Sequence, residues 1–493
     1  MSDIKQIIES AAERALKEMN VEGFSVSVVK DAETLYSGGF GFADSEKKEK
    51  MTDGHLLPIG SASKAFTATG AVILADEGKV DLDAPVRGYM PEFRLSDPEA
   101  SASASLRDLL CHRTGLPRHD LLWICWGEAE RNELIFKALP HLAASKPFRS
   151  AWQYQNFMYA ASGCAIEKLS GKSWEDFTRE RIFAPLAMGD SAFLTGDRES
   201  GKRYSVLYKP DKDGKNEPCV NEKLQMIAPA GSIASNALDM AKWLKFNLSK
   251  GKAGDAALIS EKSFAELVKP NIPYELMPFE VPGVNRIGYG LGWFIDSYRG
   301  QLRVDHGGNL SGATALVSMI PENGIGVAIL SNANSSAVTY AMANIIEDAL
   351  LGAETKTDWI AFYKEQFDKS KKESEEAEEK FFKTKIDGKP MSHELSEYAG
   401  KYSHPGYGEL EVAADENSSD PENRLSIKFH SADAKLTHMH YDIFYADVYE
   451  MPLPASFKTG LDGSIESISV QFESGLEEFI LFKRVPAPEG EKK

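Results

Sequence analysis

Cysteine is scarce in this chain, which has four among 493 residues: Cys111, Cys125, Cys164 and Cys219. No two of them stand at the close spacing typical of zinc ligands or of redox-active dithiols. A disulfide framework is not indicated either, because such frameworks belong to small, cysteine-dense secreted domains. We therefore expect reduced, buried thiols.

Long apolar stretches are also missing. No run approaches the roughly 20 apolar residues that a helix needs to cross a bilayer. The first ten residues, MSDIKQIIES, include acidic residues and lack the continuous apolar segment of a signal peptide. We expect a cytoplasmic protein, while a leader removed ahead of this sequence stays open.

Basic residues are in the minority: 56 Lys and Arg stand against 74 Asp and Glu, which makes the formal net charge −18. A field of this sign repels phosphate backbones and anionic lipids, so we expect neither a nucleic-acid nor a membrane partner. The chain also lacks a phosphate-binding loop, a dinucleotide fingerprint and a His-Glu-x-x-His zinc motif. The expected partner is a small-molecule or short-peptide substrate, and assembly into a homo-oligomer stays open.

The order of the expected elements predicts one sheet built from both ends of a domain. A helix at 3–19 precedes two strand-like runs at 24–29 and 34–42, and the later strands are expected at 289–295, 302–305, 313–320 and 326–330. Helices are expected at 61–77, at 236–248 with Asn236 as its N-cap, and at 336–351. The fold class is an α/β (α+β) sandwich, an antiparallel sheet flanked by helices with a helical subdomain at roughly 80–285.

The C-terminal part differs in character. Residues 353–392 are dense in Lys and Glu and predict a solvated helical linker without chemistry. After Pro390 the pattern becomes strand-like, with runs at 409–412, 425–429, 443–448 and 465–472 separated by turn residues. This pattern predicts a separate small all-β barrel or sandwich at 393–493.

The first element with chemical content is Ser61-Ala62-Ser63-Lys64. Positions three apart share one face of a helix, so the Ser61 hydroxyl and the Lys64 amine can meet. A helix start adds free N–H groups and a positive dipole that favour an oxyanion, and a partly desolvated lysine can take the serine proton. The spacing alone is weak evidence, because it recurs at 2–5, 27–30, 45–48 and 249–252.

The second element is Tyr154-Gln155-Asn156, the one Tyr-x-Asn in the chain. A phenol can relay protons between a nucleophile and a leaving group. The Asn156 amide can donate to a substrate carbonyl and accept from Lys64. In isolation, a buried tyrosine beside a turn asparagine is the favoured explanation of the pattern.

The third element is His306-Gly307-Gly308, placed after the strand expected at 302–305. The glycines let the backbone approach a substrate closely, and a backbone N–H there can contribute to an oxyanion hole. By position this N–H belongs to Asn309, opposite the N–H of Ser61. A lone histidine beside glycines is more often structural.

Taken in this order and separation, the three elements resemble those of the serine β-lactamase and penicillin-binding-protein superfamily, closest to its class C β-lactamase-like branch. Further matching segments are Gly38-Gly39-Phe40-Gly41, Arg107-Asp108-Leu109-Leu110 with 112–117, 159–171 and Pro229-Ala230-Gly231. The resemblance covers 1–352. The tail, with Tyr398-Ala399-Gly400-Lys401-Tyr402 and His438-Met439-His440-Tyr441-Asp442, is similar to the lipocalin-like C-terminal domain attached to many such hydrolases.

The resemblance implies a β-lactamase-like hydrolase domain at 1–352 and an acyl-enzyme mechanism without metal or organic cofactor. By analogy, Ser61 is the nucleophile, Lys64 its partner and Tyr154 the general base or proton shuttle. The resemblance leaves open whether Lys64 or Tyr154 takes the first proton. Substrate-binding residues carried over from the family are Asn156, His306, Gly307, Gly308 and Asn309.

His306 departs from the penicillin-directed pattern, in which a lysine meets the carboxylate of the drug. A histidine is mostly neutral at pH 7. The expected activity is therefore cleavage of amide or ester bonds in small peptide-like substrates, of the D-amino-acid peptidase or esterase type, with weak or no β-lactamase activity. An acyltransferase using the same acyl-enzyme and a non-catalytic scaffold of the same fold stay open.

Two other histidine patterns carry less weight. His438 and His440 share one face of an expected strand, but no third metal ligand is evident, and structural packing is favoured. His112 and His119 flank Gly115-Leu116-Pro117, which is typical of a helix end and turn.

Overall fold

The computed structural model describes residues 2–126, 130–196, 198–220, 224–275, 279–354, 356–415, 417–418, 420, 424–449 and 451–486. The chain divides into two compact units. Unit 1 comprises Met1–Phe93, Glu99–Gly115 and Pro147–Lys369, and unit 2 comprises Arg94–Pro98, Leu116–Lys146 and Ser370–Lys493.

Unit 1 is built on an antiparallel eight-stranded sheet with strand order β11-β12-β13-β14-β15-β1-β2-β3. The bounds are β1 Gly23–Lys30, β2 Glu33–Asp44, β3 Glu49–Lys50, β11 Val284–Tyr289, β12 Phe294–Tyr298, β13 Gln301–Leu310, β14 Ala313–Ile320 and β15 Ile325–Ser331. The first strand pairs with the last, as in Val26 opposite Ile329. The prediction of one sheet formed from both ends of the domain is confirmed.

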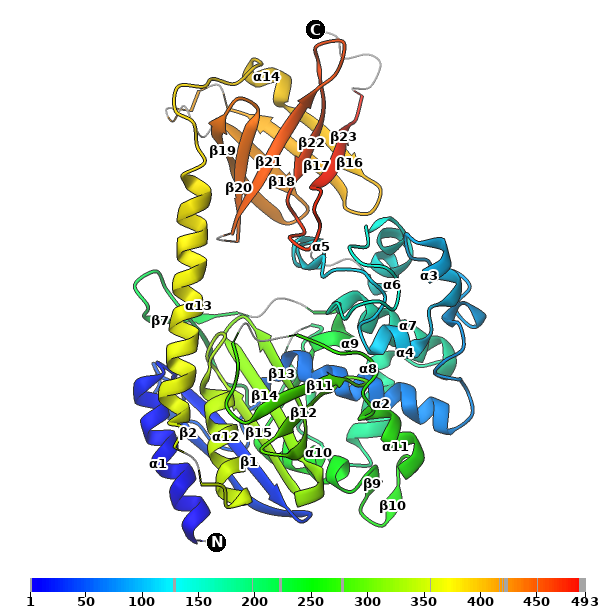
Figure 1. The fold of residues 1–493 in the computed structure, drawn as a ribbon, viewed down its shortest axis with the longest axis vertical. Coiled ribbons are helices and arrows are strands. Elements are labelled where there is room, and N and C mark those ends of the chain that lie inside the picture. The colour runs from blue at the N-terminus through cyan, green and yellow to red at the C-terminus, as the bar shows by residue number, and fades with distance from the viewer. Residues whose placement is uncertain are drawn as a thin grey trace. The chain divides into compact units, whose positions relative to one another are not determined.

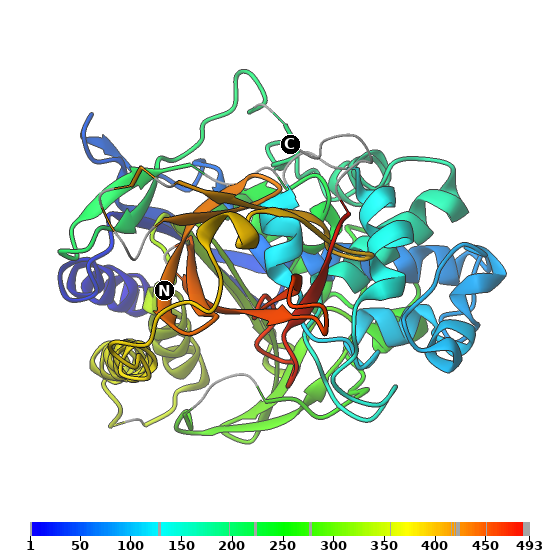
Figure 2. The same ribbon diagram turned by 90° about the horizontal axis from the view of Figure 1, so that it is seen from above.

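Helices cover both faces of this sheet. On one face α1 (Ser2–Glu18) and α12 (Val338–Leu351) lie side by side, and their apolar residues join those of β1 and β15 in one core (Figures 1 and 2). On the other face lies α10 (Ala237–Leu248). Its predicted N-cap is confirmed, because the Asn236 side chain accepts the backbone N–H of Asp239 at 2.8 Å. Strands β14 and β15 are buried throughout because both faces of the sheet are covered.

Two predictions at the far edge of the sheet were wrong. The single strand expected at 289–295 is instead the end of β11, a turn at 290–293 and the start of β12. Gly292 adopts a φ of +78° there and packs against the backbone of α2, so the buried side chains of Leu291 and Trp293 imitate a strand pattern. Strand β13 also extends past Asp305 to Leu310, so His306 lies within the strand rather than after it.

The helical part of unit 1 surrounds α2 (Ser63–Asp76), which is buried on nearly all sides and is followed by Gly78 with a φ of +72°. Its neighbours are α7 (Asn156–Ser170), α8 (Trp174–Thr178), α9 (Ala228–Gly231) and α11 (Glu261–Leu267). Other short elements are α3 Pro98–Ser103, α4 Leu106–Leu110, β4 Leu57–Pro58, β5 Ala192–Phe193, β6 Leu207–Pro210, β7 Asn216–Cys219, β8 Ile233–Ser235, β9 Lys252–Ala253 and β10 Ala256–Ala257.

Unit 2 contains a closed eight-stranded barrel, which confirms the predicted β-barrel. Its strands are β16 Gly400–His404, β17 Gly408–Ala414, β18 Leu425–Phe429, β19 Ala432–His440, β20 Ile443–Val448, β21 Met451–Thr459, β22 Ile465–Val470 and β23 Ile480–Arg484. Burial alternates along them, as in β18, because every second side chain points into the barrel. Positions 416, 419, 421–423, 450 and 487–493 of the predicted domain lie outside the described residues.

The segment Leu116–Lys146, with α5 (Asp120–Trp126) and α6 (Arg131–Glu133), packs on this barrel within unit 2. His119 Nδ1 lies 2.7 Å from the Tyr407 hydroxyl, and the Trp126 ring stacks on the ring of His430. Helix α13 (Trp359–Phe382) contains the division between the two units. The short α14 (Leu395–Tyr398) precedes the barrel.

All four cysteines lie among the described residues, and all four are free thiols. Burial raises the pKa of the Cys111 and Cys125 thiols to about 12. Within the described ranges, no helix combines the length and apolar character needed to span a membrane.

Candidate active site

Ser61 lies where a buried helix begins. A short 3-10 turn, η1 (Gly60–Ala62), leads directly into α2, so the serine stands in the first turn of a continuous helical segment. Helix starts leave backbone N–H groups without intrahelical partners and carry a partial positive charge. Ser61 is partly exposed, whereas most of α2 is buried. The hydroxyl is therefore placed at the boundary between the core and solvent.

Lys64 is completely buried, and its amine nitrogen lies among three oxygen atoms. Nζ is 3.0 Å from Ser61 Oγ, 2.8 Å from Asn156 Oδ1 and 2.9 Å from the carbonyl oxygen of Ala230. The last two oxygens only accept, so they take two N–H groups of the amine. The third position on the nitrogen faces Ser61. A charged amine donates to Oγ there, whereas a neutral amine presents its lone pair to the serine proton.

The Tyr154 ring lies beside the same nitrogen, with its centroid 4.7 Å from Lys64 Nζ. Tyr154 is in the extended segment before α7, whose N-cap residue Gln155 accepts the N–H of Phe157 through its side chain at 2.8 Å. Asn156 is the first residue of that helix. Two helix starts, those of α2 and α7, therefore bring four of the sequence-predicted residues together.

His112 supports the position of Tyr154 from behind. The Gln153 N–H donates to the His112 carbonyl at 2.8 Å, and the Gln155 N–H donates to His112 Nδ1 at 3.1 Å. The His112 ring centroid lies 4.5 Å from that of Tyr154. Gln153 and Gln155, the two neighbours of Tyr154, both donate hydrogen bonds to His112. His112 therefore fixes the backbone on either side of the tyrosine.

The backbone of β13 approaches the serine closely at Gly308. A Cβ on Gly308 would overlap the Ile59 carbonyl oxygen and would lie 2.8 Å from Ser61 N. Gly60 has a φ of +51°, and a Cβ there would lie 2.9 Å from Asn309 N. The backbone of Gly60–Ser61 thus packs directly against that of Gly308–Asn309, which brings the two candidate oxyanion-hole nitrogens into the same part of the site.

His306 is buried, and both of its ring nitrogens are engaged inside the protein. Nδ1 lies 2.6 Å from the carbonyl oxygen of Gly307, which only accepts, so Nδ1 carries the hydrogen. Nε2 lies 3.0 Å from the Tyr289 hydroxyl and accepts from it. Burial and the charge of Lys64 lower the pKa of His306 to about 3. The histidine is neutral and directs no N–H toward a substrate.

This burial makes stability depend on pH in a definite direction. The unfolded histidine takes up a proton below about pH 6.5, whereas folded His306 does so only near pH 3, so acid favours unfolding. Between pH 7 and pH 5 the free energy of unfolding of the wild type should fall by about 2 kcal/mol relative to His306→Gln. Urea titrations of both proteins at the two pH values measure this difference, with His438→Gln as the control. Parallel losses in the wild type and in His306→Gln would contradict it.

Two residues of this site were not among the predicted site residues. His112 was set aside as part of a helix end, and Tyr289 was not singled out. Only the family-like segment at 112–117 offered a signal for His112. Gly307 faces away from Ser61, and a Cβ on it would lie 3.0 Å from the hydroxyl of Tyr340 on α12.

The fold and this site define a hydrolase of the β-lactamase type. A family model described as Beta-lactamase matches residues 8–351, so the chain belongs to the beta-lactamase family. A second model, Domain of unknown function (DUF3471), matches residues 384–484. The resemblance drawn from the three sequence elements is confirmed.

Three proteins illustrate what the chain is similar to. Unguisins hydrolase ungD' of Aspergillus campestris is 27% identical over 96% of this chain and 90% of its own length. The octameric penicillin-binding protein homologue of Pyrococcus abyssi shares the fold with a TM-score of 0.61 at 23% identity, covering 97% of this chain and 99% of its own. The D-amino acid amidase of Ochrobactrum anthropi, complexed with L-phenylalanine amide, has a TM-score of 0.59 at 25% identity, covering 71% and 98%.

Proposed function

We propose that the protein is a serine hydrolase that cleaves amide or ester bonds of small peptide-like substrates through an acyl-enzyme on Ser61. The observation that carries this proposal is the buried Lys64 amine, 3.0 Å from Ser61 Oγ and held by two carbonyl oxygens. Burying a cation costs free energy even when polar partners offset part of the cost, and a non-catalytic scaffold has no need to place a buried lysine beside a partly exposed serine hydroxyl.

Acylation begins when Ser61 Oγ attacks the substrate carbonyl carbon and transfers its proton either to Lys64 in its neutral form or to Tyr154 in its phenolate form. The carbonyl oxygen becomes an oxyanion, which the N–H groups of Ser61 and Asn309 stabilise. The tetrahedral intermediate collapses, the leaving amine or alcohol departs with the proton, and the acyl group stays on Ser61. Water then attacks the ester, losing its proton to the same groups, and releases the acid.

The state of His306 supports substrates without a free carboxylate beside the bond that is cleaved. Its two ring nitrogens are used by Gly307 and Tyr289, and its pKa near 3 keeps it neutral. It therefore offers no cation to a penicillin carboxylate. We expect weak or no β-lactamase activity, and the similar D-amino acid amidase supports amides as substrates.

Assembly into a homo-oligomer belongs to this proposal as well. The support is the octameric assembly of the similar Pyrococcus abyssi protein. Native mass measurement of the full chain tests it, and a single monomer peak at micromolar concentration would exclude a stable oligomer.

The test of the proposed reaction is intact-mass detection of an acyl-enzyme. The full chain is mixed with D-amino-acid amides, short esters and β-lactams, and the wild type is compared with Ser61→Ala. We expect adducts on the wild type with amides or esters and no adduct on Ser61→Ala. Adducts that persist in the variant would overturn the assignment of Ser61. Products formed with added amines would instead reveal an acyltransferase.

A further inference from the structure

Strand β13 separates the candidate active site from a cavity on its other face. Side chains alternate along a strand, so His306 and Gly308 lie on the Ser61 side, whereas Arg303, Asp305 and Gly307 face the opposite way. The cavity on that opposite face has a volume of about 680 Å³, within the usual range for small-molecule sites.

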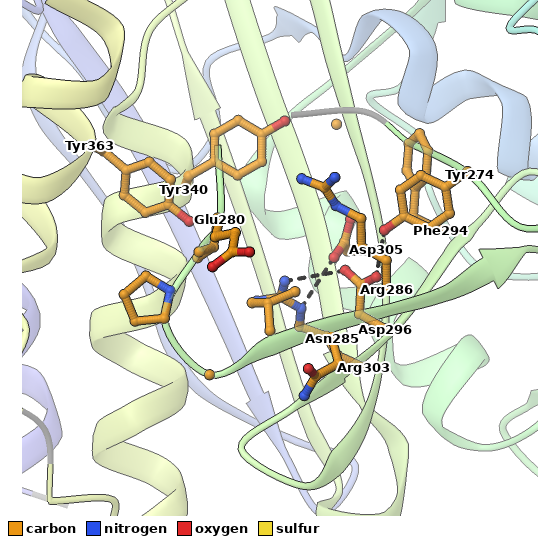
Figure 3. Close-up of a pocket in the computed structure, with 15 residues that line it drawn as sticks. Tyr274, Glu280, Asn285, Arg286, Phe294, Asp296, Arg303, Asp305, Tyr340 and Tyr363 are labelled. Carbon is orange, nitrogen blue, oxygen red and sulfur yellow. Dashed lines mark hydrogen bonds and ion pairs between the residues drawn. The ribbon is translucent and has the colours of Figure 1, made fainter. Parts of the chain in front are cut away.

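Four aromatic rings and a set of charged groups line the cavity. Tyr340 and Tyr363, from α12 and α13, lie on one side, and Tyr274 and Phe294 lie on the other (Figure 3). Between them are the carboxylates of β12 and β13, and the segment before β11 closes the remaining wall. The charged residues of the lining are Glu280, Arg286, Asp296, Arg303 and Asp305.

The buried charges here do not balance. The Arg303 guanidinium is the shared partner of three carboxylates. It lies 3.4 Å from Asp296 and 3.2 Å from Asp305, both drawn in Figure 3, and 3.5 Å from Glu347. These side chains are 14% exposed or less. Arg286 also lines the cavity but is exposed to solvent. Glu347 is not among the lining residues. In the lining itself, the acidic Glu280, Asp296 and Asp305 outnumber the basic Arg286 and Arg303 by one, and this excess is costly where the groups are poorly solvated.

The pKa of the Asp305 carboxyl shows the effect of these crowded acidic groups. Burial, with the neighbouring charges of Asp296 and Glu347, raises the pKa of its carboxyl to about 7 despite the opposing Arg303. The carboxyl of Glu347 also has a raised pKa because of its burial. A cation placed in the cavity would offset this excess charge.

The lining favours an organic cation over a metal ion. Among the residues that the structure describes, no group of three or more His, Cys, Asp or Glu side chains is arranged to hold a metal. Aromatic faces attract ammonium groups within about 6 Å of the ring centroid. The Tyr340 hydroxyl, which lies close to Gly307, adds a polar group at the same wall.

We propose that this cavity binds a small organic primary ammonium ion, with its charge beside Asp305 and Glu280 and its apolar body among the four aromatic rings. The site is separate from Ser61, so the proposal does not depend on the reaction proposed above. Because Asp305 and Gly307 alternate with His306 and Gly308 on one strand, an occupant would touch the same backbone that approaches Ser61.

The test is calorimetric titration of the full chain with benzylammonium and with its neutral analogue, benzyl alcohol. We expect saturable binding of the amine and at least tenfold weaker binding of the alcohol. Asp305→Asn should weaken amine binding at least tenfold, and Glu280→Gln about threefold, whereas Glu13→Gln on α1, an equal change of net charge, should leave it unchanged. Equal affinities for amine and alcohol, no saturable binding, or unaltered binding in Asp305→Asn would overturn the proposal.

Two checks keep the test decisive. Glu280 is exposed, so Glu280→Lys should fold normally and should weaken amine binding even if Asp305→Asn does not fold. Photocrosslinking with a diazirine-bearing alkylammonium, followed by peptide mapping, should label the peptides that contain Tyr340 or Tyr363. Labelling confined to the peptide of Tyr154 would place the amine at the catalytic serine and refute the separate site.

Discussion

Replacing Ser61 with alanine is expected to reduce amide and ester turnover by at least ~10⁴-fold, since losing the nucleophile leaves only the stabilisation from binding and the oxyanion hole. The Lys64 amine would keep its two carbonyl partners, Asn156 Oδ1 and the Ala230 carbonyl, so the fold should be preserved. Steady-state kinetics on the amide or ester that acylates the wild type measures the change.

Ser63→Ala is the matched control, because it removes a hydroxyl two positions away on the same helical segment. Ser63 Oγ is buried and accepts the backbone N–H of Ile233 at 3.1 Å, so its loss should lower stability by about 1 kcal/mol and leave turnover within about tenfold. An active Ser61→Ala enzyme, or an equally inactive Ser63→Ala enzyme, would show that Ser61 is not the nucleophile.

Replacing Lys64 with methionine should reduce kcat by at least ~10³-fold, because methionine fills a similar volume but cannot accept or return the serine proton. Asn156 Oδ1 and the Ala230 carbonyl lose their donor, which adds a stability cost of a few kcal/mol. Kinetics together with near-ultraviolet circular dichroism separates lost chemistry from lost folding.

A second readout of Lys64→Met does not depend on turnover. The charge of Lys64 is one cause of the lowered pKa of His306, so the pKa of His306 should rise in the variant. Histidine-selective NMR titration measures this shift. Lys242→Met, at a surface lysine paired with Asp239, is the control and should change neither kcat nor the His306 signal. Unchanged kcat in Lys64→Met would exclude Lys64 as proton acceptor.

Much of the sheet was predictable from local patterns. Alternation and turn residues placed β1, β2, β14 and β15 within a few positions, and the polar Asn236 marked the start of α10. The prediction of one strand at 289–295 was wrong for a physical reason. Leu291 and Trp293 are apolar residues at alternate positions, which is typical of a strand, but here tertiary packing buries them within a turn. The length of β13 beyond Asp305 was missed for a different reason, because Gly307 and Gly308 weaken the strand pattern there.

In the candidate site, too, some features could be predicted from the sequence and others could not. The order and separation of the three short motifs supplied the candidates Ser61, Lys64, Tyr154, Asn156 and the glycines of β13, and the structure brings Ser61, Lys64, Tyr154 and Asn156 together. The motifs did not show that His306 turns both ring nitrogens inward, because this depends on the hydroxyl of Tyr289 from another strand. The motifs also did not show that His112 lies behind Tyr154. Its position depends on the positive φ of His112 and on two hydrogen bonds from the backbone, and neither can be read from the residue types.

By itself, the sequence determined the family, the expected sheet and the barrel, and it supplied Ser61 and Lys64 as the candidate nucleophile and its partner, because these depend on residue types at short, regular spacings. Only the tertiary structure decided which helix starts meet, the tautomer of His306, the grouping of Leu116–Lys146 with the barrel, and the cavity behind β13. All of these depend on contacts between residues far apart in the chain. Such contacts are selected by packing and charge, and no local pattern records them.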